Sequence, residues 1–371
     1  MMRHFLLLCL IPCCAFAQEP TVPVQKSVHT LVQSTALPGS PYLAFPAVLD
    51  LGEEVLVSFK KGRSHAADGD AVLDFLRIEK GTGKVLSHQT LAALKGEIMQ
   101  MGEWVHFPNG DIASYIDAQQ NQGSLRTGLC VVRSVDGGRI FGDVQRVGPI
   151  DGVEYGYAFD AITHGQTTWM LAMTFANLKG GKLVHKTKSQ PGSVDVIRTD
   201  DNGQTWHFVR SITGELGDAP INESAFLRQG DGFIVTARGY DNREWLMRTD
   251  MDFKWLTKMD LTAATPAITS HIGRPRLFEK DGGVYLLGRN WVKKGVMELA
   301  LFQVDPKTLS ITRHLVLDNL EKVPVADGYY AQAYWQQRDG RTVLHVITYK
   351  RAAAKSPDIL CLDFDWAELK S

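Results

Sequence analysis

The sequence predicts an all-β fold: a six-bladed β-propeller with four antiparallel strands per blade. Two observations carry this prediction. A pair of β-rich runs around a glycine-containing turn recurs six times, and no helical pattern of useful length interrupts the series. Successive turn glycines differ in residue number by 58, 55, 67, 50 and 58, and they are Gly52, Gly110, Gly165, Gly232, Gly282 and Gly340.

The hairpins supply two strands for each repeat, and a third β-rich run follows every hairpin. A weaker fourth run follows most of them, so each repeat has the four strands of a propeller blade. The hairpins are expected at residues 46–59, 103–116, 159–173, 225–238, 275–288 and 333–349. The third strands are expected near residues 71–78, 128–134, 194–200, 244–250, 297–305 and 358–364.

The last repeat reaches the C-terminus without an outer strand, whereas the run from Val28 to Thr35 has no partner near it. We therefore expect residues 28–35 to complete the last blade and close the ring. No Pro-, Gly- or Ser-rich linker divides the chain. The sequence thus predicts one domain from residue 18 to residue 371.

The composition is that of an ordinary globular protein, with 371 residues, 44% hydrophobic residues and a formal net charge of -1. Such a balance gives no electrostatic attraction to nucleic acid or to an anionic membrane. We therefore expect a monomer without a nucleic-acid partner.

Residues 1–17 read as a secretory signal peptide, with a short basic start, an apolar stretch and a small-x-small site ending at Ala17. No later run approaches 18 apolar residues, so no membrane span is expected. The sequence predicts cleavage after Ala17 and a secreted or periplasmic protein.

The cysteine pattern gives no sign of a disulfide or a metal centre. Three of the five cysteines lie in the leader, and Cys130 and Cys361 each lie within an apolar run. They are expected to be buried unpaired thiols. Because no HExxH, CxxC or His-x-His motif occurs, no metal or other cofactor is expected.

Two turns between third and fourth strands share a hydroxyl residue, an aspartate and a glycine at fixed spacing. They are Ser134-x-Asp136-x-Gly138, followed by Phe141, and Thr199-x-Asp201-x-Gly203, followed by Trp206. The hydroxyl and carboxylate can bind turn backbone, and glycine permits a positive φ. These turns are similar to Asp-boxes, and their expected role is structural.

With six blades and two Asp-box turns, the chain resembles the sialidase (neuraminidase) superfamily over essentially all of residues 18–371. Sialidases carry a glutamate at the start of one inner strand and an arginine at the end of the return strand of that hairpin. Glu223 and Arg238 match this arrangement. The resemblance departs at the first family motif, Arg-Ile-Pro, where this chain reads Ala44-Phe45-Pro46.

Further family positions follow from the same resemblance. The loop after the first hairpin has Arg63 and, five residues on, Asp68. The next family arginine corresponds to Arg274, with Arg276 as the alternative register. The family nucleophile corresponds to Tyr329, with Tyr330 as its alternative.

The resemblance also implies roles. A tyrosine activated by a glutamate attacks a sugar that carries a carboxylate, because a neutral nucleophile is not repelled by that charge. Tyr329 and Glu223 would form this pair, and Asp68 would act as general acid and base. Arginine forks bind a carboxylate bidentately. The substrate-binding residues that the resemblance implies are Arg63, Arg238 and Arg274. His65, between Arg63 and Asp68, and His271, three residues before Arg274, are additions to the family pattern. We expect them to bind substrate too, in place of the missing donor at position 44 or by contact with a different sugar.

The sequence thus favours an exported exo-glycosidase acting on a sialic acid or a related acidic sugar. The sequence leaves two alternatives open. One is a carbohydrate-binding propeller that has lost catalysis, which the alanine at position 44 favours. The other is a polysaccharide lyase in which His65 or His271 and a tyrosine move protons beside a uronate.

Overall fold

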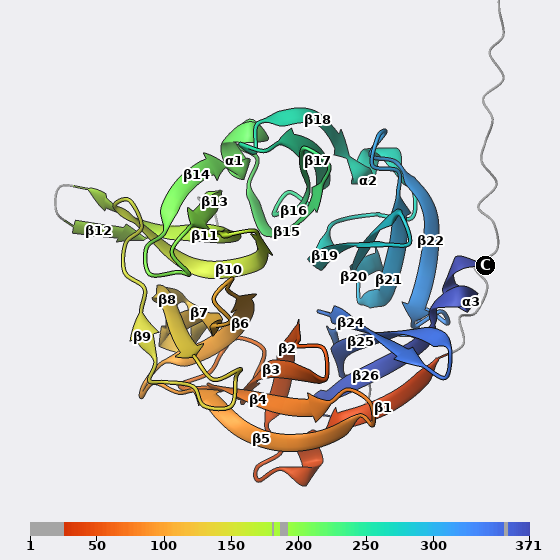
Figure 1. Ribbon diagram of the computed structural model, residues 1–371, viewed down its shortest axis with the longest axis horizontal. Coiled ribbons are helices and arrows are strands. Elements are labelled where there is room, and N and C mark those ends of the chain that lie inside the picture. The colour runs from red at the N-terminus through yellow and green to blue at the C-terminus, as the bar shows by residue number, and fades with distance from the viewer. Residues whose placement is uncertain (1–25, 180–181, 186–191, 352–354) are drawn as a thin grey trace, which may run out of the picture.

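The computed structural model describes residues 26–179, 182–185, 192–351 and 355–371, and its strands form six antiparallel sheets around one axis (Figure 1). The predicted six-bladed propeller is confirmed. The expected signal peptide, with Cys9, Cys13 and Cys14, lies outside the described residues. Among the described residues, no helix is long and apolar enough to cross a membrane.

The first three blades each run from an inner strand outward in chain order. Blade 1 consists of β2 (Tyr42–Asp50), β3 (Glu54–Gly62), β4 (Val72–Glu79) and β5 (Lys84–Ala92). Blade 2 consists of β6 (Ile98–His106), β7 (Ile112–Gln120), β8 (Leu125–Ser134) and β9 (Gln145–Arg146). Blade 3 consists of β10 (Val153–His164), β11 (Thr167–Lys179), β13 (Val194–Thr199) and β14 (His207–Ser211), and β12 (Lys182–His185) pairs with β11.

The last three blades repeat this order. Blade 4 consists of β15 (Ile221–Gln229), β16 (Gly232–Gly239), β17 (Glu244–Asp250) and β18 (Trp255–Asp260). Blade 5 consists of β19 (Ile272–Lys280), β20 (Gly283–Lys293), β21 (Val296–Val304) and β22 (Ile311–Asp318). Blade 6 consists of β24 (Gln332–Arg338), β25 (Arg341–Arg351), β26 (Asp358–Asp365) and β1 (Ser27–Val32), and β23 (Asp327–Gly328) pairs with β25.

Helical segments are short and peripheral to the sheets. They are α1 (Ile212–Glu215), α2 (Leu261–Ala264), α3 (Trp366–Lys370) and two 3-10 turns, Ser34–Ala36 and Asn121–Gly123. The N-terminal strand β1 pairs antiparallel with β26, with Val28 opposite Leu362. The predicted ring closure is confirmed, although the strand ends at Val32 because the chain then enters the first 3-10 turn.

The hairpin turns use glycine as the sequence pattern indicates. Gly52, for example, has a φ of 89°, a left-handed conformation that side chains rarely adopt. In the fourth hairpin the positive φ belongs to Gly230 rather than to the predicted Gly232.

Both Asp-box turns form as expected. Thr199 Oγ1 donates to Asp201 Oδ1 at 2.7 Å and accepts from the Gly203 amide at 2.9 Å. Trp206 is buried and its Nε1 donates to the hydroxyl of Tyr115 at 3.0 Å. This aromatic contact joins blade 3 to blade 2, so the turn holds neighbouring blades together.

The starts of three inner segments share an unusual backbone conformation that shapes the centre of the ring. Phe45, Arg274 and Tyr329 have φ values of 58°, 48° and 67°. Such values are costly for residues other than glycine and persist where surrounding structure enforces them. In a regular strand, successive side chains point to opposite faces of the sheet. The positive φ values interrupt this alternation, so the direction of the next side chain cannot be inferred from the sequence pattern.

Candidate active site

A buried polar cluster lies where the inner strands meet, and Glu223 is its hub. The hairpin of β15 and β16 brings Arg238 to Glu223, and Arg238 Nη1 donates to Glu223 Oε2 at 2.6 Å. The backbone amide of Arg274 donates to the same oxygen at 2.9 Å. The contact predicted between Glu223 and Arg238 is therefore present.

The tyrosine in this cluster is Tyr330, so the sequence assignment to Tyr329 needs correction. Tyr330 donates its hydroxyl hydrogen to Glu223 Oε1 at 2.7 Å. Tyr329 points elsewhere and donates to Asp318 Oδ2 at 2.6 Å. The positive φ at Tyr329 explains the error, because it turns the two neighbouring tyrosines into different environments.

The second arginine beside this tyrosine is Arg289 of β20, which sequence reasoning missed. Its Nη2 donates to the Tyr330 hydroxyl at 3.2 Å, and its guanidinium lies 4.4 Å from the centre of the tyrosine ring. Arg238 Nη1 also donates to that hydroxyl, at 3.1 Å. Tyr330 thus accepts from two guanidinium groups and donates to one carboxylate.

A sequence signal for Arg289 existed. Arg238 lies six residues after Gly232 (238 − 232), and Arg289 lies six residues after Gly283 (289 − 283). These glycines are the first residues of β16 and β20, so both arginines stand at equivalent positions on return strands.

The side chain of Arg274 belongs to a second buried group instead, which corrects its predicted place in the clamp. Arg274 Nη2 and Arg276 Nη2 each donate to Glu103 Oε2 at 2.6 Å. Arg276 also pairs with Asp160 at 3.0 Å, and Gln332 donates to Glu103 at 3.2 Å. These residues come from β6, β10, β19 and β24, so the group ties four blades together across the axis.

The electrostatics of the Glu223 group favour a firmly ionised carboxylate. Burial alone would raise the pKa of Glu223, but the charge of Arg238 and the hydrogen bond from Tyr330 hold it well below its usual range. Burial and the Glu223 charge raise the pKa of Tyr330, whereas Arg289 and Arg238 act in the opposite direction. The resting state is a neutral phenol bonded to a carboxylate.

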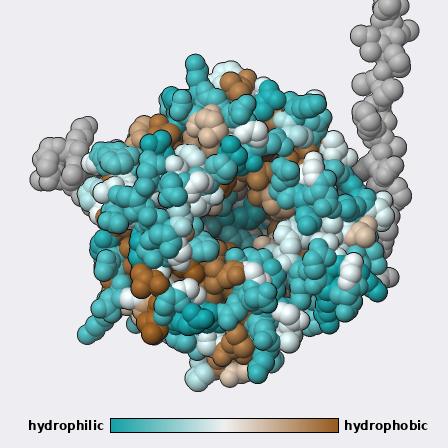
Figure 2. All heavy atoms as spheres, in the orientation of Figure 1, coloured by the Kyte–Doolittle hydropathy of each residue, from teal (hydrophilic) through white to brown (hydrophobic). Residues whose placement is uncertain are grey.

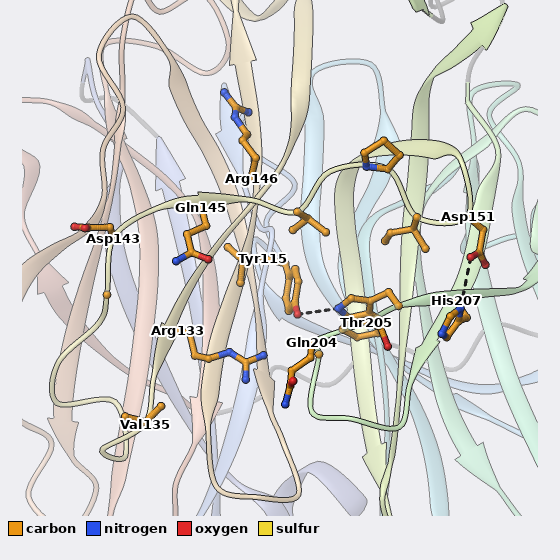
Figure 3. Close-up of a pocket in the computed structure, with 17 residues that line it drawn as sticks. Tyr115, Arg133, Val135, Asp143, Gln145, Arg146, Asp151, Gln204, Thr205 and His207 are labelled. Carbon is orange, nitrogen blue, oxygen red and sulfur yellow. Dashed lines mark hydrogen bonds and ion pairs between the residues drawn. The ribbon is translucent and has the colours of Figure 1, made fainter.

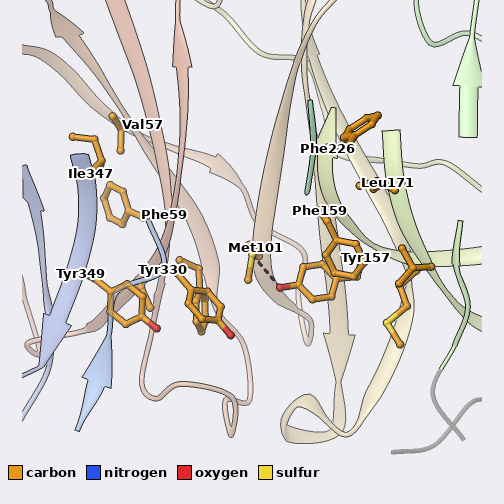
Figure 4. Close-up of a cluster of buried hydrophobic side chains, with 14 of the residues drawn as sticks. Val57, Phe59, Met101, Tyr157, Phe159, Leu171, Phe226, Tyr330, Ile347 and Tyr349 are labelled. Carbon is orange, nitrogen blue, oxygen red and sulfur yellow. Dashed lines mark hydrogen bonds between the residues drawn. The ribbon is translucent and has the colours of Figure 1, made fainter. Parts of the chain in front are cut away.

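Aromatic side chains surround the cluster. The Tyr157 hydroxyl lies 3.3 Å from Glu223 Oε1 and 3.3 Å from the sulfur of Met101. Figure 4 shows Met101 between the rings of Tyr330 and Tyr157, with the Tyr157 hydroxyl turned toward it. In the space-filling view the ring is hollowed at its centre, with hydrophilic residues deep in the hollow (Figure 2).

Asp68 does not reach this cluster as a free carboxyl group. Its side chain is completely buried, lies 2.6 Å from Nζ of the equally buried Lys60, and accepts from the Arg63 amide at 2.6 Å. Burial lowers the pKa of Lys60, whereas the Asp68 carboxylate raises it. Arg63 is exposed, and no contact among the described residues joins its side chain to the cluster.

His65, in the same loop, does lie beside the cluster. Its Nδ1 is 2.7 Å from Asp327 Oδ2, and its ring packs edge-on against Phe45 at 4.9 Å between centroids. Phe45 in turn contacts the ring of Tyr330 at 5.6 Å. Asp327 lies 3.7 Å from Arg289, so a continuous polar chain runs from His65 to Tyr330.

His271 lines a side cavity of about 780 Å³ with Trp291 and Lys293 among its walls. Burial, with the charges of Arg238 and Arg289, lowers the pKa of His271 to about 3, so it is neutral near pH 7. Its Nε2 is buried without a hydrogen-bond partner among the described residues.

Ala44 is fully buried, and its side chain supplies no hydrogen-bond donor. Two arginines, rather than the three of the family pattern, therefore face Tyr330.

A larger cavity, of about 950 Å³, lies between blades 2 and 3 (Figure 3). Its walls include the short outer strand β9 and the Asp-box residues Gly203, Thr205 and Trp206. Figure 3 shows Asp151 paired with His207, and the hydroxyl of Tyr115 accepts from Trp206 Nε1 in the same wall. Because its walls are blade-joining turns and it contains none of the clustered residues above, we assign it no chemistry.

One group in the described part of the chain has donor atoms close enough to hold a metal ion. It consists of His345, Cys361 and Asp363, whose atoms lie within 4.8 Å of one another. Asp363 already accepts from the other two, at 2.7 Å and 3.1 Å. Cys130 and Cys361 are buried free thiols, as predicted.

Glu244, directly opposite Arg238 on β17, gives a prediction for stability. Burial raises the pKa of Glu244 to about 8 from an ordinary value of 4.5. The folded state therefore holds a proton that the unfolded chain releases, and stability falls as the pH rises from 4.5 to 8. The loss is at most on the order of 1.4 kcal/mol for each pH unit.

Glu244→Gln is expected to flatten this fall and to raise the free energy of unfolding at pH 8, because an amide can keep the contacts with Thr236 and the Ile272 amide. Urea unfolding of both proteins at pH 5 and pH 8 measures the effect. Parallel pH dependence in the two proteins would contradict the assignment.

Comparison with known proteins supports the fold. No protein-family model matches the chain, and no curated protein matches its sequence. A protein of unknown function from Dyadobacter fermentans is similar in structure, with a TM-score of 0.68, 13% identity, and coverage of 91% of this chain and 99% of that one.

Sialidases are also similar in structure. The Trypanosoma rangeli sialidase has a TM-score of 0.64 and 11% identity over 94% of this chain and 61% of its own. That sialidase has also been solved in complex with sialic acid. A mutant of the NanB sialidase from Streptococcus pneumoniae has a TM-score of 0.62 and 10% identity, over 94% of this chain and 71% of its own. The protein thus has a sialidase-like propeller fold.

Proposed function

We propose that the protein is a sialidase-like glycoside hydrolase that removes a terminal acidic sugar, of the sialic acid type, from a glycan. The observation that supports this most directly is the arrangement around Tyr330. One phenol donates to the carboxylate of Glu223 and accepts from two guanidinium groups, Arg238 and Arg289. A nucleophilic tyrosine paired with a base suits a sugar that carries its own negative charge.

In this proposal Tyr330 attacks the anomeric carbon and Glu223 accepts the phenolic proton. The Arg238 contact keeps Glu223 ionised in the resting protein. A substrate carboxylate that binds Arg238 would share that positive charge, and the pKa of Glu223 would then rise. Substrate binding would thereby turn Glu223 into a better proton acceptor at the moment when one is needed.

Arg238 and Arg289 hold the substrate carboxylate in this proposal. A charge-assisted hydrogen bond contributes on the order of 1.5 to 3 kcal/mol. With alanine at position 44, we expect weaker binding of a sialic acid than a three-arginine clamp would give. His271 stands at the side cavity, where it can contact a further part of the glycan.

The test is to incubate the purified protein with a panel of acidic glycans and with the 4-methylumbelliferyl glycoside of sialic acid, and to identify products by mass spectrometry. Release of the free acidic sugar supports the proposal. A product with a new double bond would instead indicate a lyase. Binding without any product would indicate a non-catalytic propeller.

Arg289→Lys tests whether Arg289 binds the substrate carboxylate through its two-pronged guanidinium group or only through its positive charge. Lysine keeps the charge but loses the fork that binds a carboxylate bidentately. We expect kcat/KM on the 4-methylumbelliferyl glycoside to fall by about 10- to 100-fold, the equivalent of one charge-assisted bond. The exposed Arg341, changed to lysine as a control, should leave the rate unchanged. An unchanged rate in Arg289→Lys would remove Arg289 from the clamp.

A further inference from the structure

The proposed hydrolysis needs a group that protonates the leaving oxygen and later deprotonates water. Asp68, the residue that resemblance suggested, is poorly placed for this work. Its side chain has no exposed surface and is paired with Lys60, whose Nζ also donates to Gln100 and to two backbone carbonyls. Neither side chain of the pair exposes any surface to a ligand.

The same loop presents a different candidate in His65. About half of its side chain is exposed, at 49%, whereas Asp327 beneath it is 10% exposed. Nδ1 is occupied by Asp327, so Nε2 is the nitrogen available to a ligand, and no protein partner for it is found among the described residues. A carboxylate that orients one imidazole nitrogen and leaves the other open is a common arrangement for a proton-transferring histidine.

The surroundings fix this histidine rigidly. Lys60 Nζ and Gln100 Nε2 both donate to its backbone carbonyl, at 3.1 Å and 2.8 Å. Phe45 supports its ring and also touches Tyr330. The buried pair of Lys60 and Asp68 thus acts as a support beneath the loop.

Asp327 is held just as firmly. It accepts from the hydroxyls of Tyr42 and Tyr349 and lies near Arg289. Although burial opposes ionisation, the contacts with His65 and Tyr42 lower the pKa of Asp327 to about 2. It is therefore a carboxylate near pH 7 and can stabilise positive charge on the His65 ring.

We propose that His65, oriented by Asp327, is the general acid and base of the reaction in place of Asp68. This inference rests on the proposed glycosidase function. His65 is the catalytic residue in this scheme, and Asp327 is a positioning residue that acts through it.

The proton balance closes over both halves of the reaction. In the first, Tyr330 oxygen bonds to the anomeric carbon, its proton passes to Glu223, and the bond to the leaving oxygen breaks as that oxygen takes the Nε2 proton of His65. In the second, neutral His65 takes a proton from water, the water oxygen bonds to the anomeric carbon, and the bond to Tyr330 breaks as Tyr330 regains its proton from Glu223. Tyr330, Glu223 and His65 all return to their starting states.

Leaving-group dependence tests the proposal. The probes are the 4-methylumbelliferyl glycoside of sialic acid, whose leaving group departs without a proton, and the lactose glycoside, which needs one. General acid catalysis contributes about 10²- to 10⁴-fold. We expect His65→Ala to lower kcat on the lactose glycoside by about 10²- to 10⁴-fold. With the 4-methylumbelliferyl glycoside, the bond-breaking step should slow by less than about tenfold. The rate of that step is measured as a pre-steady-state burst.

His164→Ala is the matched control, because His164 is exposed on the far turn of β10 and should leave both rates unchanged. Asp68→Asn is compared in the same assay, with folding checked by circular dichroism. If His65→Ala slows both probes equally, or if Asp68→Asn shows the selective loss instead, the assignment of His65 is overturned. If the wild-type protein cleaves neither probe nor any panel glycan, the proposed function fails and the assignment fails with it.

Asp327→Asn tests the positioning role in the same assay. The groups facing His65 are Asp327 and Lys60, with Arg289 behind Asp327. Without the Asp327 carboxylate, His65 loses the group that orients it, so kcat should fall on the lactose glycoside and change much less in the bond-breaking step with the 4-methylumbelliferyl glycoside. An equal loss on both probes, or no loss on either, would exclude Asp327 as a positioning residue.

Discussion

Tyr330→Phe is expected to reduce turnover of a sialic acid glycoside by at least about 10³-fold, because it removes the proposed nucleophile and with it the covalent step. Binding should persist, since Arg238 and Arg289 remain. Steady-state kinetics on the 4-methylumbelliferyl glycoside measures the loss, and calorimetry with a non-hydrolysable sialic acid analogue measures binding.

Tyr329→Phe is the matched control for this prediction. It removes one hydroxyl from the adjacent residue, and that hydroxyl bonds Asp318 rather than Glu223. Turnover by this variant should stay within about twofold of wild type, with some loss of stability from the missing hydrogen bond. If Tyr329→Phe abolished turnover while Tyr330→Phe kept it, the whole arrangement derived for the site would be wrong.

Glu103→Gln is expected to lower the free energy of unfolding by about 3 to 5 kcal/mol. The change keeps the shape of the side chain but leaves two arginines, Arg274 and Arg276, buried with less opposite charge. Their side chains are 3% and 8% exposed, so water cannot replace the lost partner. Urea unfolding near pH 7 gives the value.

The comparison for Glu103 is an ion pair at the surface. Arg341 is 74% exposed and lies 3.9 Å from Asp365, and Arg341→Gln should cost less than about 1 kcal/mol. If both variants lost a similar free energy of unfolding, the buried group of Glu103, Arg274 and Arg276 would not be what holds the blades together.

The parts of this molecule that sequence predicts well are those governed by local pattern. The hairpins follow from alternating apolar runs and turn glycines, and a hairpin returns its chain to the point of departure, which is why Glu223 and Arg238 meet as expected. The closing strand could be predicted because the last repeat had only three strands and residues 28–35 formed a strand without a neighbouring partner.

The parts that sequence could not supply depend on contacts between distant segments or on backbone irregularities. Tyr329 and Tyr330 could not be told apart, because a positive φ sets their directions. Asp68 was expected to be a loop carboxylate, but it is buried because it forms an ion pair with the buried Lys60 of β3. Arg289 could have been found from its spacing after Gly283. The family arginine was instead assigned to Arg274, which lies on an inner strand.

The pairing of β1 with β26 has a consequence for how the molecule assembles. Val28 and Leu362 are 334 residues apart (362 − 28), yet they are neighbours in one sheet. Five sheets form from contiguous stretches of chain, whereas the sixth combines β1 with strands roughly 300 residues later in the sequence. During synthesis β1 therefore has no partner until β26 has been made. Closing so long a loop adds little to the equilibrium cost, since doubling loop length costs only about 0.6 kcal/mol, but non-local pairing slows the search. Ring closure should accordingly be the late event in refolding, and a chain cut short before β26 would hold an open arc.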